Sequence, residues 1–274
     1  IFHDDQHGTA VVVLVGLLNA LRVTGRDIGS LMVLVNGAGA AGIAVTRLIM
    51  KAGVKDVILC DTHGILRPGR DSMNPSKEAI AAVTNPERLQ GGLSEGLRGR
   101  DLFIGLSGPN LVTSGMVKSM AARPIIFALA NPMPEIAPEA ALAAGAAVVA
   151  TGRSDYKNQI NNAIAFPGIF RGALDVAARN INDEMKIAAA HALADLVPDY
   201  ELSPDYILPK ALDFRGAPEV AAAVARAALE TGEARRRVDP RLILENTRDY
   251  LYGGTLRALP GEPIGDQPVL PLKA

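Results

Sequence analysis

The sequence predicts an α/β protein in which a doubly wound, mostly parallel sheet is followed by a helical C-terminal extension. Five short runs are continuously apolar and are closed by Gly, Asn or Asp, which is typical of strands buried on both faces of a sheet. Helix-like stretches lie between the runs, and this alternation favours a doubly wound fold. The five runs are LMVLVNG (31–37), DVILCD (56–61), DLFIGLSG (101–108), PIIFALANP (124–132) and AAVVATGR (146–153).

Helices are expected on both sides of this alternating region. Residues 9–23 are apolar with few breaks, and the length of the stretch favours a buried helix over a strand. Beyond about residue 160 the pattern predicts only helices, separated by Pro-rich turns, at 183–197, 218–232 and 239–251. Residues 259–274 are too rich in Pro and Gly for regular structure and are expected to form an extended tail. We therefore expect a first domain over residues 1–200 and a helical extension with its tail over 201–274.

The composition of the chain limits its class and its partners. Apolar residues make up 49% and charged residues 21% of the 274 residues, which are globular values. The net charge of -1 gives no basis for binding nucleic acid or an anionic membrane, and the apolar stretches are expected to be too short to span a bilayer. Cys60 is the single cysteine, which excludes a disulfide within the chain and favours a reducing, cytoplasmic location.

A glycine-rich motif follows the first predicted strand and opens a helix. It comprises Gly37, Ala38, Gly39, Ala40, Ala41 and Gly42. In such a loop the first glycine permits a tight turn, the second lets the backbone approach a pyrophosphate, and the third lets helix and strand pack closely. The helix N-terminus offers free N–H groups and a partial positive charge to the phosphates. Strand, glycine loop, helix and second strand in this order predict a Rossmann-type dinucleotide site, the alternative being a glycine-rich turn without a ligand.

Asp61 ends the second predicted strand and bears on the choice of dinucleotide. An acidic residue at this point can bind the ribose hydroxyls, and it favours NAD because a carboxylate repels a 2′-phosphate. Arg67 and Arg70 follow closely and could instead meet that phosphate, or could be exposed loop charges. A modest preference for NAD is expected, with NADP left open.

The adjacent carboxylates of Asp4 and Asp5 precede the first helix, with His3 and His7 beside them. Mg²⁺ and Mn²⁺ prefer oxygen ligands and keep positions open for water or substrate, so the pair could bind one of these ions. The alternative is that an aspartate caps the helix. Zinc is disfavoured because the two histidines have no third ligand at a recognisable spacing.

Three asparagines follow late strands of the predicted sheet. Asn131 stands directly after a strand and before a proline, and Asn161 and Asn162 lie in the segment NQINNAIAFPG. Ligands of open α/β sheets lie beyond the carboxyl ends of the strands, and an amide can both donate to and accept from a hydroxy acid or a nicotinamide. The alternative is ordinary turn chemistry.

Taken together, these segments resemble a bacterial malic enzyme. The resemblance rests on FHDDQHGTA, NGAGAAG with a later CD, ALANPMPEI and TGRSDYKNQINNAIAFPGIFRGALD in this order, over roughly residues 1–195. It implies oxidation of malate with NAD or NADP and its decarboxylation to pyruvate and CO₂, with Mg²⁺ or Mn²⁺ present. We expect the enzyme to be a homo-oligomer.

The resemblance also implies roles for individual residues. Asp5 is expected to be a metal ligand and Asp4 its catalytic neighbour. Asn131 and Asn162 are expected to contact the substrate and the nicotinamide end of the cofactor, with Asn161 beside them. The glycine loop is expected to bind the pyrophosphate.

The sequence departs from the family pattern in two respects. The family's further Glu–Asp metal pair and its acid–base Tyr and Lys belong to a domain upstream of the DD segment, so that domain is expected to be absent from this chain. Lys157 stands where a proline is expected, and Tyr156 and Lys157 are predicted to lie in a solvent-facing loop instead of replacing the acid–base pair. Two other functions stay open: another NAD(P)-dependent dehydrogenase, such as an amino-acid dehydrogenase, and a non-catalytic dinucleotide-binding module.

Overall fold

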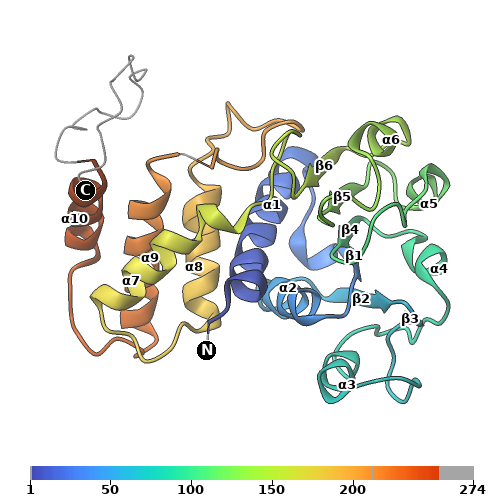
Figure 1. The fold of residues 1–274 in the computed structure, drawn as a ribbon, viewed down its shortest axis with the longest axis horizontal. Helices are drawn as coiled ribbons and strands as arrows, with labels where there is room; N and C mark the ends of the chain where they lie inside the picture. Colours follow the sequence, from blue (N-terminus) through green and yellow to red (C-terminus); the bar gives the residue numbers. More distant parts are fainter. Residues whose placement is uncertain (1, 212, 253–274) are drawn as a thin grey trace.

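The computed structural model describes residues 2–211 and 213–252, and it places one six-stranded sheet beside a group of helices (Figure 1). The strands follow the order β3-β2-β1-β4-β5-β6 across the sheet. Their bounds are β1 Met32–Asn36, β2 Asp56–Asp61, β3 Gly64–Ile65, β4 Leu102–Gly105, β5 Ile125–Ala128 and β6 Val148–Thr151. The five predicted strands are therefore confirmed, as is the α/β class with its mostly parallel sheet.

All strand pairs of this sheet are parallel except the pair at one edge. β1 pairs with β2 on one side and with β4 on the other, so the strand order reverses beside β1. β3 runs antiparallel to β2 through a two-residue turn, with Cys60 opposite Ile65. Sequence analysis missed β3, because two residues inside the turn-like segment THGILRPGR are too few for a hydrophobic pattern.

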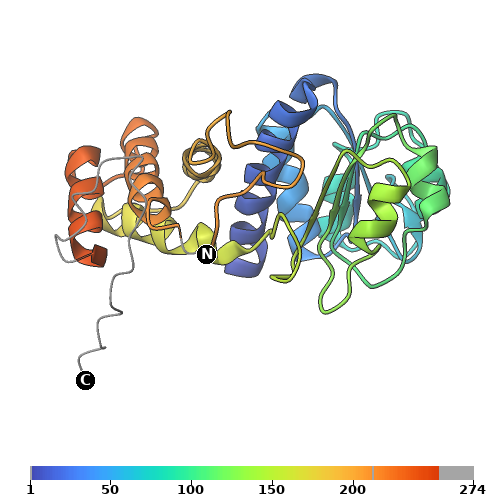
Figure 2. The ribbon, with the colours of Figure 1, turned by 90° about the horizontal axis from the view of Figure 1, so that it is seen from above.

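Helices cover both faces of the sheet, and Figure 2 shows the sheet edge-on between these two layers. Side chains alternate along each strand, so that Val33 and Val35 face one apolar cluster and Leu34 faces the other. The first face is covered by α1 (Thr9–Thr24), α2 (Ala40–Lys51) and α3 (Pro75–Ala81), and the second by α4 (Leu93–Leu97), α5 (Ser114–Ser119) and α6 (Pro138–Ala143). Both faces of the sheet are therefore buried, which explains its continuously apolar strands.

The first helix lies in the core of the protein. A π-helical turn, η1 (Asp4–Gly8), runs directly into α1, and together they form the helix Asp4–Thr24. By length and composition this helix could cross a membrane, so the expectation that every apolar stretch is too short was wrong. Its residues from Ala10 to Leu17 are nevertheless buried against α2, α8 (Asp183–Ala194) and the sheet, and the predicted buried helix is confirmed.

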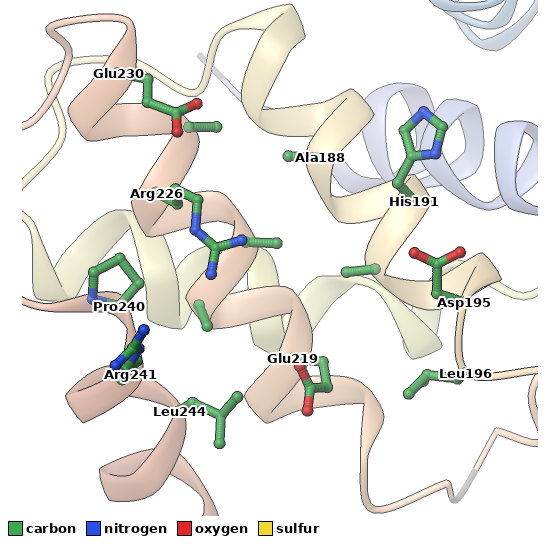
Figure 3. Close-up of a pocket in the computed structure, with 14 residues that line it drawn as sticks. Ala188, His191, Asp195, Leu196, Glu219, Arg226, Glu230, Pro240, Arg241 and Leu244 are labelled. Atoms are coloured by element: carbon green, nitrogen blue, oxygen red, sulfur yellow. The ribbon is translucent and has the colours of Figure 1, made fainter.

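Among the described residues, only helices and loops follow about residue 160, as predicted. α7 (Phe166–Asp175), α8, α9 (Gly216–Glu230) and α10 (Pro240–Tyr252) lie to one side of the sheet (Figure 1), and α9 packs against the other three. A hollow of about 540 Å³ lies between α8, α9 and α10. Alanines line it, and charged side chains including Arg226, Glu219 and Glu230 surround them (Figure 3). None of the site residues predicted from the sequence lines this hollow. The predicted tail at 259–274 lies outside the described residues.

Two glycines allow α7 and α9 to approach closely. A Cβ atom on Gly168 would lie 2.7 Å from Val220 Cγ1. A Cβ atom on Gly172 would lie 3.0 Å from Val224 Cβ and would overlap the carbonyl oxygen of Ala221. Backbone cannot move aside as a flexible side chain can, so the crossing of the two helices depends on these glycines.

We expect Gly172→Ala to lower the free energy of unfolding by about 1–3 kcal/mol, because the added methyl group overpacks the contact between α7 and α9. Urea unfolding followed by circular dichroism measures this change. The control is Gly115→Ala, at an exposed helical position where the nearest atom to a new Cβ is 3.7 Å away. Equal stability of the two variants would contradict the packing argument.

Candidate functional site

The candidate site lies where loops leave the carboxyl ends of the parallel strands. Beside β1 the chain crosses to β2 in one direction and to β4 in the other, and this reversal leaves a crevice above the sheet. Two hollows occupy this edge of the structure, one of about 510 Å³ and one of about 350 Å³. The glycine motif, whose last residues form the first turn of α2, contributes residues to both hollows: Gly37, Ala38 and Gly39 to the larger and Ala41 to the smaller.

Each of the three glycines in this loop has a different steric environment. Gly37 has φ +117°, and a Cβ atom on it would lie 2.6 Å from the carbonyl oxygen of Leu106. A Cβ atom on Gly42 would overlap the carbonyl oxygen of Gly37, so the turn and the first turn of α2 are packed backbone to backbone. A Cβ atom on Gly39 would meet nothing within 4 Å, because Gly39 faces the larger hollow. The loop therefore leaves open space directly before the N-terminus of α2, where a phosphate group can approach backbone N–H groups.

Asp61 lies at the far side of the larger hollow, and its carboxylate is fully engaged. Oδ1 accepts hydrogen bonds from the backbone N–H of His63 (2.9 Å) and from Arg70 Nη1 (2.8 Å). Oδ2 accepts from Arg70 Nη2 and from Lys77 Nζ, both at 2.7 Å. Burial acts to raise the pKa of Asp61, but the hydrogen bonds from Arg70 and Lys77 outweigh it and hold this pKa well below its usual range.

Lys77 belongs to this site although sequence analysis did not identify it. It stands on the first turn of α3, whose N-cap Asn74 accepts a hydrogen bond from the backbone N–H of Lys77. Both Asn74 and Lys77 line the larger hollow. Of the two arginines considered from the sequence, Arg70 is the one that pairs with Asp61, and its side chain is only 8% exposed. The sequence pattern that could have identified Lys77 is the helix start shortly after the second strand, where Asn74 is the N-cap residue.

The smaller hollow brings together residues from opposite ends of the predicted domain. Asp5, from the turn η1, faces Asn131 after β5 and the segment after β6 that holds Asn161 and Asn162. Ala41 of the glycine loop also lines this hollow. All of the predicted metal and substrate residues therefore lie around one space.

Asp4 lies beside this hollow and is tied to its wall. Its Oδ2 accepts a hydrogen bond of 2.6 Å from Asn162 Nδ2. Its Oδ1 is buried against Gly8 and has no hydrogen-bond donor among the described residues. Burial and the neighbouring charge of Asp5 both raise the pKa of Asp4.

The alternatives of ordinary capping and turn chemistry apply unequally to these residues. Neither Asp4 nor Asp5 is the N-cap residue of the first helical turn, which is His3, and no side chain caps that turn. Asn161 does follow turn chemistry, because its Oδ1 accepts from the backbone N–H of Ala163 (3.0 Å).

The two histidines next to the aspartates contact each other. His7 Nδ1 accepts a hydrogen bond from the backbone N–H of His3 (2.9 Å). Within residues 2–211 and 213–252, no three His, Cys, Asp or Glu side chains form a group that could hold a metal ion.

The loop with Tyr156 and Lys157 lies outside both hollows. Lys157 is 71% exposed and pairs with Asp205 at 2.5 Å, while the ring of Tyr156 contacts the guanidinium of Arg153. The prediction of a solvent-facing loop is therefore confirmed for Lys157.

Comparison with known proteins identifies the family of the chain. Residues 6–229 match the family model described as "Malic enzyme, NAD binding domain". The bifunctional malic/malolactic enzyme of Bacillus subtilis is 55% identical over 90% of this chain, and the NADP-dependent malic enzyme of Escherichia coli is 42% identical over 92% of it. The crystal structure of malic enzyme from Pyrococcus horikoshii matches 93% of this chain with a TM-score of 0.88 and 44% identity. The chain spans 61% of the B. subtilis relative, 35% of the E. coli relative and 61% of the P. horikoshii chain.

We expect Gly39→Val to abolish dinucleotide binding without unfolding the protein. The branched side chain fills the open space before α2, whereas a Cβ atom at this position meets no atom of the protein within 4 Å. Calorimetric titration with NADH and NADPH measures the affinity, and circular dichroism reports the fold. Gly115→Val, on the exposed surface of α5, is the control and should bind normally. Unchanged affinity in folded Gly39→Val would contradict the assignment of the loop.

Proposed function

Because this chain belongs to the malic enzyme family, whose NAD-binding domain it matches, we propose that it supplies the dinucleotide half of a malate-decarboxylating active site. The complete reaction is oxidation of malate with NAD or NADP, followed by loss of CO₂ to give pyruvate. The main support for this proposal is the position of the glycine motif, which borders both the larger hollow and the smaller hollow that Asp5 and the asparagines line. A cofactor lying along this loop would extend from Asp61 towards Asn131.

The described residues fit a dinucleotide. The pyrophosphate would lie over Gly39, with backbone N–H groups of Ala40 and Ala41 at the N-terminus of α2. The adenosine side would lie by Asp61 and Lys77 in the larger hollow. Asn131 would meet the nicotinamide end, where its amide can both donate and accept.

The described residues also fit part of a site for Mg²⁺ or Mn²⁺. Asp5 offers an exposed carboxylate, and Asn131 and Asn162 offer amide oxygens around the same hollow. Hard divalent cations take oxygen ligands and are often held by one or two carboxylates together with the substrate. We propose Asp5 as the ligand from this chain. When bound, the ion supplies Lewis-acid polarisation of the substrate oxygen.

Asp4 and the asparagines then act on the substrate side. The raised pKa of Asp4 and its orphaned, buried Oδ1 favour a group that takes part in the chemistry over one that only caps a helix. Asn162 fixes the orientation of Asp4 through their 2.6 Å hydrogen bond. Asn131 and Asn161 line the same hollow and would orient the hydroxy acid.

For the choice between the two dinucleotides, we propose that NADP binds at least as well as NAD. An ionised carboxylate has about four acceptor positions, and those of Asp61 receive four hydrogen bonds from the protein itself. Arg70 and Lys77 carry two positive charges against the single negative charge of Asp61. This excess positive charge favours a 2′-phosphate, and it removes the basis for the NAD preference expected from Asp61 alone.

The other expectations for the whole protein remain proposals. A reducing, cytoplasmic location is supported by the single cysteine, Cys60, which is buried and free. The homo-oligomer and the domain boundary at residue 200 stay predictions.

We expect Lys77→Gln to weaken NADPH binding by about tenfold and to leave NADH binding nearly unchanged, since a charge-assisted hydrogen bond contributes about 1.5–3 kcal/mol. Fluorescence titration with each reduced dinucleotide measures the two affinities. Lys118→Gln, on the exposed surface of α5, is the matched control. Equal losses for both dinucleotides, or no loss for either, would contradict the proposed role of Lys77.

We expect the chain by itself to bind a reduced dinucleotide but not to turn over malate. The cofactor residues are all present, whereas proton-transfer catalysis by a Tyr and a Lys belongs to another part of the enzyme in the proposed arrangement. The measurements are dinucleotide binding and malate-dependent absorbance of reduced nicotinamide with Mn²⁺ present. Absence of binding would overturn the proposed function. Robust turnover would contradict the proposal that the acid–base residues belong to another part of the enzyme. Tyr156 and Lys157 would then be the first candidates for that role.

A further inference from the structure

Glu135 is a fully buried acidic residue that the proposed chemistry does not use. It lies in the loop between β5 and α6, and its side chain is buried with 0% exposure. Its two carboxylate oxygens accept hydrogen bonds from two different loops. Oε1 accepts from the backbone N–H of Ser107 (3.2 Å), after β4, and Oε2 accepts from that of Ala130 (3.1 Å), after β5.

The surrounding backbone makes room for this carboxylate. A Cβ atom on Gly105, the last residue of β4, would lie 2.5 and 2.7 Å from the two oxygens of Glu135. Two further hydrogen bonds join the same loops, from Asn110 N–H to the Pro134 carbonyl (3.1 Å) and from Val112 N–H to the Glu135 carbonyl (3.0 Å). The carboxylate is thus the inner connection of a larger contact between the loops.

The two amides that Glu135 holds belong to the cofactor site. Ala130 directly precedes Asn131, which lines the smaller hollow. Ser107 lines the larger hollow, and its Oγ accepts a hydrogen bond of 2.7 Å from Asn36 Nδ2 beside the glycine loop. One side chain therefore fixes the walls of both hollows on the side away from Asp61.

Stabilisation of the fold is a poor explanation for the buried carboxyl group of Glu135. Burial raises the pKa of Glu135, although hydrogen bonds from Ala130 and Ser107 oppose that effect. Because its pKa is raised on folding, this carboxyl group contributes less to stability at neutral pH than at a pH low enough to protonate it in both states. What the carboxylate supplies is geometry, because only two acceptor oxygens can hold two converging N–H groups.

We propose that Glu135 is a positioning residue that holds the loops after β4 and β5 in the arrangement needed to bind the pyrophosphate and nicotinamide end of a dinucleotide. This inference rests on the proposed function. It makes a specific distinction within the site, because the adenosine end is bound by residues of β2 and α3 that Glu135 does not touch.

The test is Glu135→Gln, measured with two probes on the same purified chain. A carboxamide keeps the shape but turns an NH₂ group towards one of the two N–H donors, so one loop loses its acceptor. We expect the Kd for NADH and NADPH to rise about tenfold, as for loss of a hydrogen bond to a charged group. The Kd for AMP should rise much less, because Asp61 and Lys77 do not contact Glu135. The variant should remain folded, with circular dichroism like that of the original chain, although the unpaired N–H group lowers its thermal midpoint.

Two further variants complete the experiment. Glu139→Gln makes the same chemical change at an exposed position four residues later, and it should bind both probes as the original chain does. Gly105→Ala leaves Glu135 in the sequence but displaces its carboxylate, and it should reproduce the selective loss of dinucleotide affinity.

The outcomes separate this inference from the proposed function. If the original chain binds NADH and NADPH and Glu135→Gln binds them equally well, the positioning role is overturned while the proposed function stands. If Glu135→Gln loses AMP affinity as much as dinucleotide affinity, or no longer folds, the role is structural and the inference is likewise overturned. If the original chain binds neither dinucleotide, the proposed function itself fails.

Discussion

The candidate site depends on one close approach of backbone to backbone, between the turn after β1 and the first turn of α2. No side chain fits between Gly42 and the carbonyl of Gly37, and Gly37 in turn lies against the backbone of Leu106 after β4. These contacts fix the start of α2 over the end of the sheet and leave Gly39 facing open space. The site is thus built mainly from main-chain geometry, and the side chains around it adjust what that geometry can hold.

Much of the fold could be predicted because its signals are local. Each buried strand is a short apolar run, and the glycine spacing marks one turn between a strand and a helix. The clustering of Asn131, Asn161 and Asn162 also followed from a general rule, since parallel strands end at a common edge. That Asp5 joins them was implied only by the family resemblance. β3 was missed because two residues carry no periodicity.

The electrostatic features of the site could not be predicted in the same way. Asp61 by itself indicates NAD, and only the folded chain shows that Arg70 and Lys77 occupy its oxygens. Glu135 lies in the segment NPMPEI, which has the composition of an exposed turn, yet it is buried. In both cases the partners come from other loops, and a linear sequence gives no measure of that proximity.

The hydrogen bond between Asp4 and Asn162 joins residues 158 positions apart, and this separation has a consequence for the order of folding. During synthesis the chain emerges from its N-terminal end, so the segment with Asp4 and Asp5 is made long before the wall that completes their hollow. The glycine loop and its helix are local and can form early. The hollow that gathers Asp5, Asn131 and Asn162 can close only after the last strand of the sheet has been added. The wall that holds Asn161 and Asn162 is therefore among the last parts of this region to be made, and Asp4 waits for its hydrogen-bond partner until then.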